Sequence, residues 1–90
     1  MNPAVHWRLE TTATFDREFR KLDRTTQRRV LAHLLDLAQL PDPRLRAKGL
    51  TGNYGGQWRY RVGDHRILTV IDDKTLIVLA LTVGHRSEVY

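Results

Sequence analysis

The chain has 90 residues, of which 41% are hydrophobic and 28% charged, and it contains no cysteine. This length supports one domain, which we expect to cover residues 1–90, and the composition excludes a disordered chain and a membrane-spanning protein. The lack of cysteine excludes a disulfide framework, a thiolate metal site and a cysteine nucleophile.

The sequence predicts neither a bound metal nor another cofactor. Its histidines are scattered without the spacing of metal ligands: His6, His33, His65 and His85. Residues 1–4 lack the charged and then apolar layout of a signal peptide. We therefore expect a cytoplasmic protein that does not enter the membrane.

The positive charge is concentrated in one segment. The formal net charge is +5, and residues 44–66 alone carry a net charge of +5. The charged residues of this segment are Arg44, Arg46, Lys48, Arg59, Arg61, Asp64 and Arg66. A basic patch of this kind favours an anionic partner such as a nucleic acid or an acidic protein.

The first part of the chain predicts a strand followed by two helices. Residues 5–11 alternate between apolar and polar side chains, which is typical of a half-buried strand. Phe15, Phe19 and Leu22 then recur with helical spacing, and Asp23 is a suitable cap for a second helix that ends before Pro41. We expect the second helix to present one broad apolar face, made of Val30, Leu31, Leu34, Leu35, Leu37 and Ala38.

The second part predicts a glycine-rich segment and then three strands. Residues 44–56 indicate a loop or the start of a strand, and the strands are expected at 57–62, 65–71 and 75–83. The fold class is therefore α+β in the order β-α-α-β-β-β. We expect a twisted antiparallel or mixed sheet with the helical hairpin packed on one face.

The short connection Gly63-Asp64 predicts the register of the first hairpin. A two-residue loop pairs Val62 with His65 and Arg61 with Arg66. Alternate residues share a face, so Arg59, Arg61 and Arg66 should project from one side. The other side should carry Trp58, Tyr60, Val62, Ile67 and Ile71. Each arginine alone could be merely solvated, but three on one face favour a site for phosphate, which arginine binds with two nitrogens at once.

The last strand is apolar on both faces and should be central in the sheet. It leads into Gly84-His85-Arg86 at one end of the sheet. If a two-residue loop precedes this strand, His85 projects from the same face as Arg66.

Several segments together resemble the RelE/ParE superfamily of bacterial toxins, and RelE-type toxins in particular. The similarity extends over nearly the whole chain. It is carried by Lys-Gly-Leu-Thr-Gly at 48–52, Trp-Arg-Tyr-Arg at 58–61, Gly-Asp-His-Arg-Ile-Leu at 63–68, Ile-Asp-Asp-Lys at 71–74 and Val-Gly-His-Arg-Ser-Glu-Val-Tyr at 83–90. The resemblance implies an endoribonuclease that cleaves mRNA on the ribosome, without a metal, by attack of a ribose 2′-hydroxyl on the adjacent phosphate.

The resemblance also implies roles for individual residues. Arg59 and Arg61 match a basic pair on one strand, Arg66 and Arg86 match phosphate-binding arginines, and Tyr90 matches a tyrosine that orients a base. Arginine is a poor general base, so His85 is the expected proton acceptor. Further RNA contacts are expected from the basic segment, at Arg44, Arg46 and Lys48.

The partners implied by the resemblance are mRNA, the ribosome and a cognate antitoxin that forms a hetero-oligomer with the toxin. Two alternatives stay open. A ParE-like toxin has the same fold but inhibits DNA gyrase by protein contact, and a basic RNA-binding domain has no activity of its own.

Overall fold

The computed structural model describes residues 7–49 and 56–88. Its helical segments are α1 (Ala13–Arg20), α2 (Arg24–Gln39) and a short 3-10 turn, η1 (Pro43–Arg46). The strands are β1 (Arg8–Thr11), β2 (Lys48–Gly49), β3 (Gln57–Val62), β4 (His65–Asp72) and β5 (Ile77–His85). None of the helices in these ranges is both long and apolar enough to span a bilayer.

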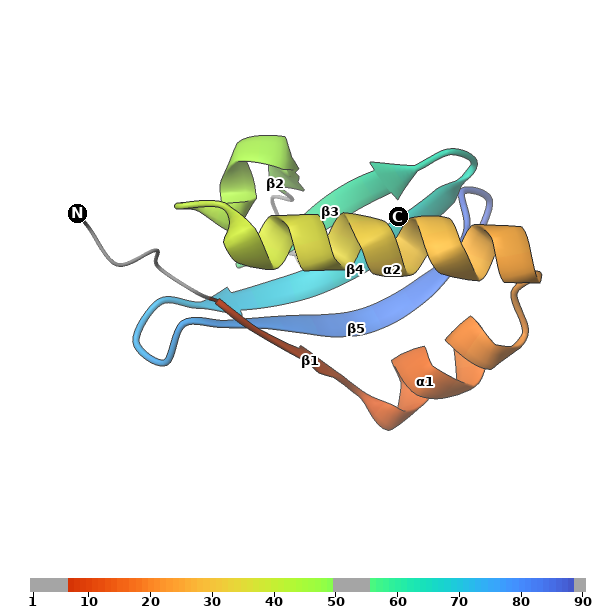
Figure 1. The fold of residues 1–90 in the computed structure, drawn as a ribbon, viewed down its shortest axis with the longest axis horizontal. Coiled ribbons are helices and arrows are strands. Elements are labelled where there is room, and N and C mark those ends of the chain that lie inside the picture. Colours follow the sequence, from red (N-terminus) through yellow and green to blue (C-terminus); the bar gives the residue numbers. More distant parts are fainter. Residues whose placement is uncertain (1–6, 50–55, 89–90) are drawn as a thin grey trace.

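The strands form one mixed sheet in the order β1-β5-β4-β3-β2. β1 runs parallel to β5, and the other neighbours are antiparallel. The predicted order of elements is confirmed, as is the interior position of the last strand (Figure 1). The segment predicted as a loop or strand start contains η1 and the two-residue β2.

Side-chain caps start both helices. The Thr12 hydroxyl accepts a hydrogen bond from the Phe15 N–H at 3.0 Å, and the Asp23 carboxylate accepts one from the Thr26 N–H at 2.7 Å. Each cap satisfies a backbone donor that has no partner within the first helical turn. The predicted cap at Asp23 is therefore confirmed.

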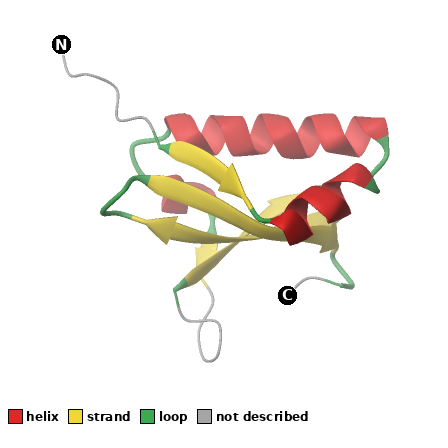
Figure 2. Ribbon diagram, turned by 90° about the horizontal axis from the view of Figure 1, so that it is seen from below, coloured by secondary structure: helices red, strands yellow, loops and turns green. Residues whose placement is uncertain are grey.

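The main core lies between the helices and the sheet, and α2 runs along one face of the sheet (Figure 2). Its buried members are Phe15, Val30, Leu34, Leu37, Tyr60, Ile67, Ala80 and Val83. The predicted apolar face of α2 was too wide, because Leu31 and Leu35 are 46% and 49% exposed. A helix packed on a single sheet buries only the stripe that touches it, and these two leucines lie outside that stripe.

The predicted register of the β3–β4 hairpin is confirmed. Arg61 pairs with Arg66, Val62 with His65 and Arg59 with Leu68. Gly63 adopts a φ of +58°, a conformation that glycine reaches without a steric penalty. This register turns Tyr60 and its neighbours toward the core, and the three arginines toward the other face.

The register at the other end of β4 was predicted wrongly. The turn between β4 and β5 has four residues, Asp73–Leu76, and the pairing of the two strands shifts between Leu68 and Thr69. Because of this shift, and not because of the length of the turn, His85 pairs with His65 and Gly84 pairs with Arg66. A shift of one residue moves a side chain to the opposite face, so His85 does not share a face with Arg66.

Candidate functional site

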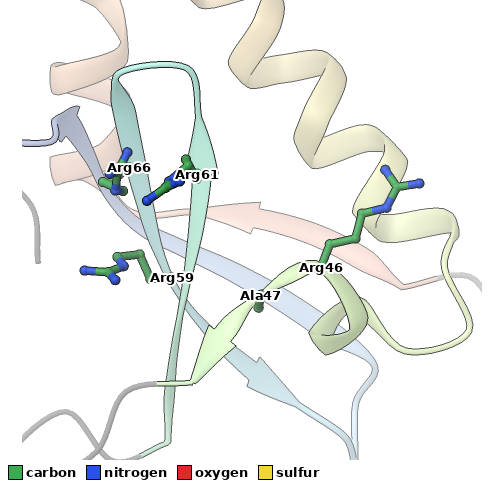
Figure 3. Close-up of a pocket in the computed structure, with 5 residues that line it drawn as sticks. All are labelled: Arg46, Ala47, Arg59, Arg61 and Arg66. Carbon is green, nitrogen blue, oxygen red and sulfur yellow. The ribbon is translucent and has the colours of Figure 1, made fainter.

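An open cleft of about 340 Å³ lies on the sheet face opposite the helices. It is lined by Arg46, Ala47, Arg59, Arg61 and Arg66 (Figure 3). Arg59 and Arg61 come from β3 and Arg66 from β4, so neighbouring strands hold all three guanidinium groups above one surface. We call these three residues the arginine cluster.

The arginine cluster carries positive charge without a matching carboxylate. Among residues 7–49 and 56–88, ion pairs with acidic side chains form only at Arg8 and Arg44. The Arg66 guanidinium donates a hydrogen bond to the His65 carbonyl at 3.2 Å. Desolvation lowers the pKa of Arg66, and the like charges of Arg61, Arg59 and Arg86 lower it further. The cluster is therefore suited to an anion, which would reduce this repulsion.

Arg86 lies close enough to act on the charge of Arg66, although it is not part of the cleft lining. It follows β5 directly, and its N–H donates to the Asp64 carbonyl at 2.7 Å. Arg86 also stands two positions after Gly84, the partner of Arg66, so strand alternation directs it toward the face of the arginine cluster. The structure thus brings Arg86 to the turn between β3 and β4, near enough for its charge to lower the pKa of Arg66.

His85 lies on the opposite face, at a second and separate pocket. Its ring meets the His65 ring edge to face, with centroids 5.8 Å apart. The Ser87 N–H donates to His85 Nδ1 at 3.3 Å, and the Ser87 hydroxyl lies 3.0 Å from the same nitrogen. The second pocket is lined by Glu18, Lys21, Leu22, His65, Val83, Gly84, His85 and Glu88.

Two residues of the predicted RNA surface have other neighbours. Arg44 donates to both carboxylate oxygens of Asp73, at 3.0 and 2.7 Å, and its guanidinium lies 5.6 Å from the Trp58 ring centroid. Arg46 lines the cleft, but Figure 3 shows its guanidinium directed away from the arginine cluster. Its charge instead acts on His33, whose pKa is lowered first by burial and then by Arg46.

The remaining predicted residues are only partly described. The backbone of Lys48 pairs with Arg59 across β2 and β3, which brings this position to the edge of the cleft. Tyr90 lies outside the described residues. His65 was not predicted as part of any site, because its contact with His85 depends on a register shift that no local sequence signal shows.

The family of the chain follows from comparison with known proteins. Residues 9–90 match the model of the ParE toxin of type II toxin-antitoxin systems. The chain belongs to the ParE toxin family. This ParE family toxin is accordingly a toxin of a type II toxin-antitoxin system with a RelE-like fold. No relative with a curated description matches it.

Solved structures similar to this ParE family toxin include RelE toxins and their complexes with antitoxins. The toxin-antitoxin complex RelBE2 of Mycobacterium tuberculosis matches with a TM-score of 0.84 and 28% identity, over 97% of this chain and 99% of that chain. The RelE-RelB complex of Pyrococcus horikoshii matches with a TM-score of 0.76 and 23% identity, over 93% and 99%. The intact RelBE complex of E. coli matches with a TM-score of 0.72 and 16% identity, over 88% and 95%. The two more distant matches establish the fold alone.

Proposed function

We propose that this toxin is an endoribonuclease that cleaves mRNA on the ribosome and thereby inhibits translation. The observation that carries the proposal is the arginine cluster, in which Arg61 directly faces Arg66 and neither forms an ion pair among the described residues. Like charges in opposed positions destabilise a sheet. Such an arrangement is expected where an anionic substrate supplies the missing negative charge.

The proposed reaction is attack of a ribose 2′-hydroxyl on the adjacent phosphate, which forms a 2′,3′-cyclic phosphate and breaks the bond from phosphorus to the 5′-oxygen. The 2′-hydroxyl gives up its proton, and the leaving 5′-oxygen takes one up. Negative charge accumulates on the phosphate oxygens in the transition state. Hydrogen-bond donors that are already in place before the reaction stabilise this charge most effectively. Arg61 and Arg66 would bind these oxygens from two strands, and Arg59 would bind a neighbouring phosphate. Arginine provides this charge itself, so the proposed mechanism does not require a metal.

His85 was expected to accept the proton, but it lies on the face opposite the arginine cluster, so in this register it does not reach a phosphate held in the cleft. The contact with the Ser87 N–H uses the lone pair of Nδ1, so in the neutral ring the proton resides on Nε2. Arg86 would support the phosphate from the turn between β3 and β4, and Tyr90 is still expected to orient a base.

A cognate antitoxin is proposed as the physiological partner. The similar RelE structures named above were solved as toxin-antitoxin complexes. An acidic or amphipathic antitoxin segment could neutralise the basic face of this chain and form a hetero-oligomer with it. Copurification from the native operon tests this, and recovery of a stable, non-toxic monomer alone would contradict it.

A second candidate is inhibition of DNA gyrase, which the match to the ParE toxin model favours. In that case the arginine cluster would contact a protein and perform no chemistry. The two candidates predict different products: cleaved mRNA in one case, and blocked supercoiling with intact mRNA in the other.

Primer extension on a defined mRNA with purified ribosomes tests the proposal. We expect cleavage by the wild type and a loss of about 100-fold or more for Arg66→Ala. His85→Ala should keep most of the activity because His85 lies on the opposite face, and a loss as large as that of Arg66→Ala would show that it transfers the proton. Arg17→Ala, which removes an exposed arginine from α1, is the matched control and should cleave normally.

A parallel supercoiling assay with purified gyrase distinguishes the second candidate. Intact mRNA together with poisoned gyrase would falsify the nuclease proposal. A third result, in which the wild type binds RNA but leaves both mRNA and gyrase unaffected, would identify a binding module instead. Such a module would show a salt-dependent affinity that falls modestly on substitution of Arg66.

A further inference from the structure

A β-bulge in β5 determines which residues face the arginine cluster. Leu68 pairs with Thr82 and Thr69 pairs with Ala80, so Leu81 is an extra residue without a partner on β4. Beyond the bulge, Gly84 pairs with Arg66, and Arg86, the first residue after β5, stands two positions further on with its N–H bonded to the Asp64 carbonyl. Without the bulge, the register that begins at Asp72 and Ile77 would pair Arg66 with Val83 and turn His85 toward the cleft.

Groups at and near α1 satisfy the polar atoms at this bulge. The Thr12 hydroxyl donates to the Leu81 carbonyl at 2.7 Å, and the Thr12 N–H donates to the Ala80 carbonyl at 3.1 Å. The Glu18 carboxylate accepts from the Val83 N–H at 3.1 Å and from the Thr82 hydroxyl. Four consecutive residues of β5, 80–83, are thus held by two residues outside the sheet.

These contacts occupy an edge that β1 leaves open. The pairing of β1 with β5 ends at Thr11 and Ala80, so the next residues of β5 have no strand beside them. Val83 is only 2% exposed, and its N–H would be buried without a partner if Glu18 were absent. A buried unpaired donor is costly, and a slip of β5 by one residue would be one way to avoid it.

We propose that Glu18, assisted by Thr12, is a positioning residue for RNA cleavage: it holds the bulge at Leu81 and thereby places Arg86 beside Arg66. This inference rests on the proposed nuclease function. Glu18 itself faces the second pocket, so it acts through β5 and does not touch the substrate in the cleft. Loss of Glu18 should exchange the faces of His85 and Arg86 while the arginine cluster stays in place.

The register of β5 can be measured independently of cleavage. The Arg86 N–H bonds to the Asp64 carbonyl, which makes His65 and His85 a non-hydrogen-bonded pair with close α-protons. The NMR spectrum of the wild type should therefore contain a strong cross-peak between these two α-protons. In Glu18→Ala we expect this cross-peak to weaken and a cross-peak between His65 and Gly84 to appear.

The rate of RNA cleavage should depend on the register of β5. We expect Glu18→Ala to reduce the single-turnover rate at saturating ribosomes on the order of 100-fold, with a change in RNA affinity of about threefold or less. Glu18→Gln keeps an oxygen that accepts both hydrogen bonds and should retain the cross-peak and most of the rate. Glu10→Gln, the same change at an acid of β1 that pairs with Arg8, is the matched control and should behave as the wild type.

Three outcomes would overturn the inference: a Glu18→Ala variant that keeps the His65–His85 cross-peak, one that loses it but cleaves normally, or a Glu18→Gln variant as impaired as Glu18→Ala. If Glu18→Ala does not fold, Thr82→Val tests the inference in its place, because it removes one of the two donors to Glu18. We then expect a partial loss of cross-peak and rate, and wild-type values would reject the proposal. A wild type that never cleaves RNA refutes the nuclease function, whereas the cross-peaks still report on the bulge.

Discussion

Arg61 and Arg66 face each other across the β3–β4 hairpin, and neither guanidinium forms an ion pair among the described residues. Desolvation, followed by the like charges of Arg61, Arg59 and Arg86, lowers the pKa of Arg66. An arrangement that opposes folding and yet lines an open cleft is typical of a site selected for binding.

Arg66→Gln should therefore make the protein more stable and less active. The substitution removes the repulsion with Arg61 and also removes a phosphate ligand, so cleavage should fall about 100-fold or more. Urea denaturation measures the first effect and primer extension the second. The gain in stability should shrink in high salt, which screens the repulsion. A loss of stability in low salt would contradict this account of the cluster.

Arg44 should contribute to stability and not to RNA binding. Arg44→Ala removes the two-nitrogen contact with Asp73 and the stacking on Trp58, and should lower the free energy of unfolding by about 1 kcal/mol. Arg44→Lys retains the charge but not the planar geometry, so it should lose part of this stability while RNA affinity stays unchanged. A drop in RNA affinity of about tenfold or more in Arg44→Ala would show that Arg44 contacts the substrate.

Tyr60 should make folding sensitive to alkaline pH. Its buried hydroxyl donates to the Pro43 carbonyl at 2.9 Å, and burial raises its pKa from 10.0 to about 12. Its contribution is fully present below pH 10 and is lost as the pH rises toward 12, because only the unfolded chain ionises readily. The free energy of unfolding should fall in this interval by about 1.4 kcal/mol per unit of pKa difference at most.

Tyr60→Phe tests this directly by urea denaturation at several pH values. At neutral pH the variant should be about 1 to 2 kcal/mol less stable, because the Pro43 carbonyl loses its donor. The difference in the free energy of unfolding between wild type and variant should become smaller above pH 10. A difference in the free energy of unfolding that stays constant up to pH 12 would show that the pKa of Tyr60 does not change on folding.

His33 should report on where the Arg46 guanidinium lies. Its Nε2 is buried without a partner in the described structure, its pKa is lowered by burial and then by Arg46, and Asp36 opposes this. Neutral His33 contributes stability above its ordinary pKa of 6.5, and this is lost as the pH falls through the lowered value. In an NMR titration, Arg46→Ala should raise the pKa of His33 and Asp36→Asn should lower it. An unchanged pKa in Arg46→Ala would mean that Arg46 points elsewhere, for instance into the cleft.

The arginine cluster could be predicted from the sequence because its geometry is local. A two-residue loop at Gly63-Asp64 determines the pairing of the hairpin, and alternation along each strand determines the faces. Nothing outside residues 57–70 is needed to bring Arg59, Arg61 and Arg66 to one surface. The cap at Asp23 was predictable for the same reason, since it bonds only three residues ahead.

The surroundings of the cluster could not be predicted in this way. Leu31 and Leu35 have the spacing of core residues, but only the width of the contact with the sheet shows that they are exposed. Arg44 looks like part of the basic patch, yet its main partner, Asp73, is 29 residues away. Such pairings depend on which segments fold together, and the spacing of residues carries no signal for them.

The sequence by itself determined the order of the elements, the hairpin register and the shared face of Arg59, Arg61 and Arg66, because turn length and strand period act over a few residues. The tertiary structure decided the faces of His85 and Arg86. The bulge that sets them is held by Thr12 and Glu18, which lie 69 and 65 residues from their partners in β5. Only the folded chain brings these groups to a strand edge whose unpaired backbone atoms require them.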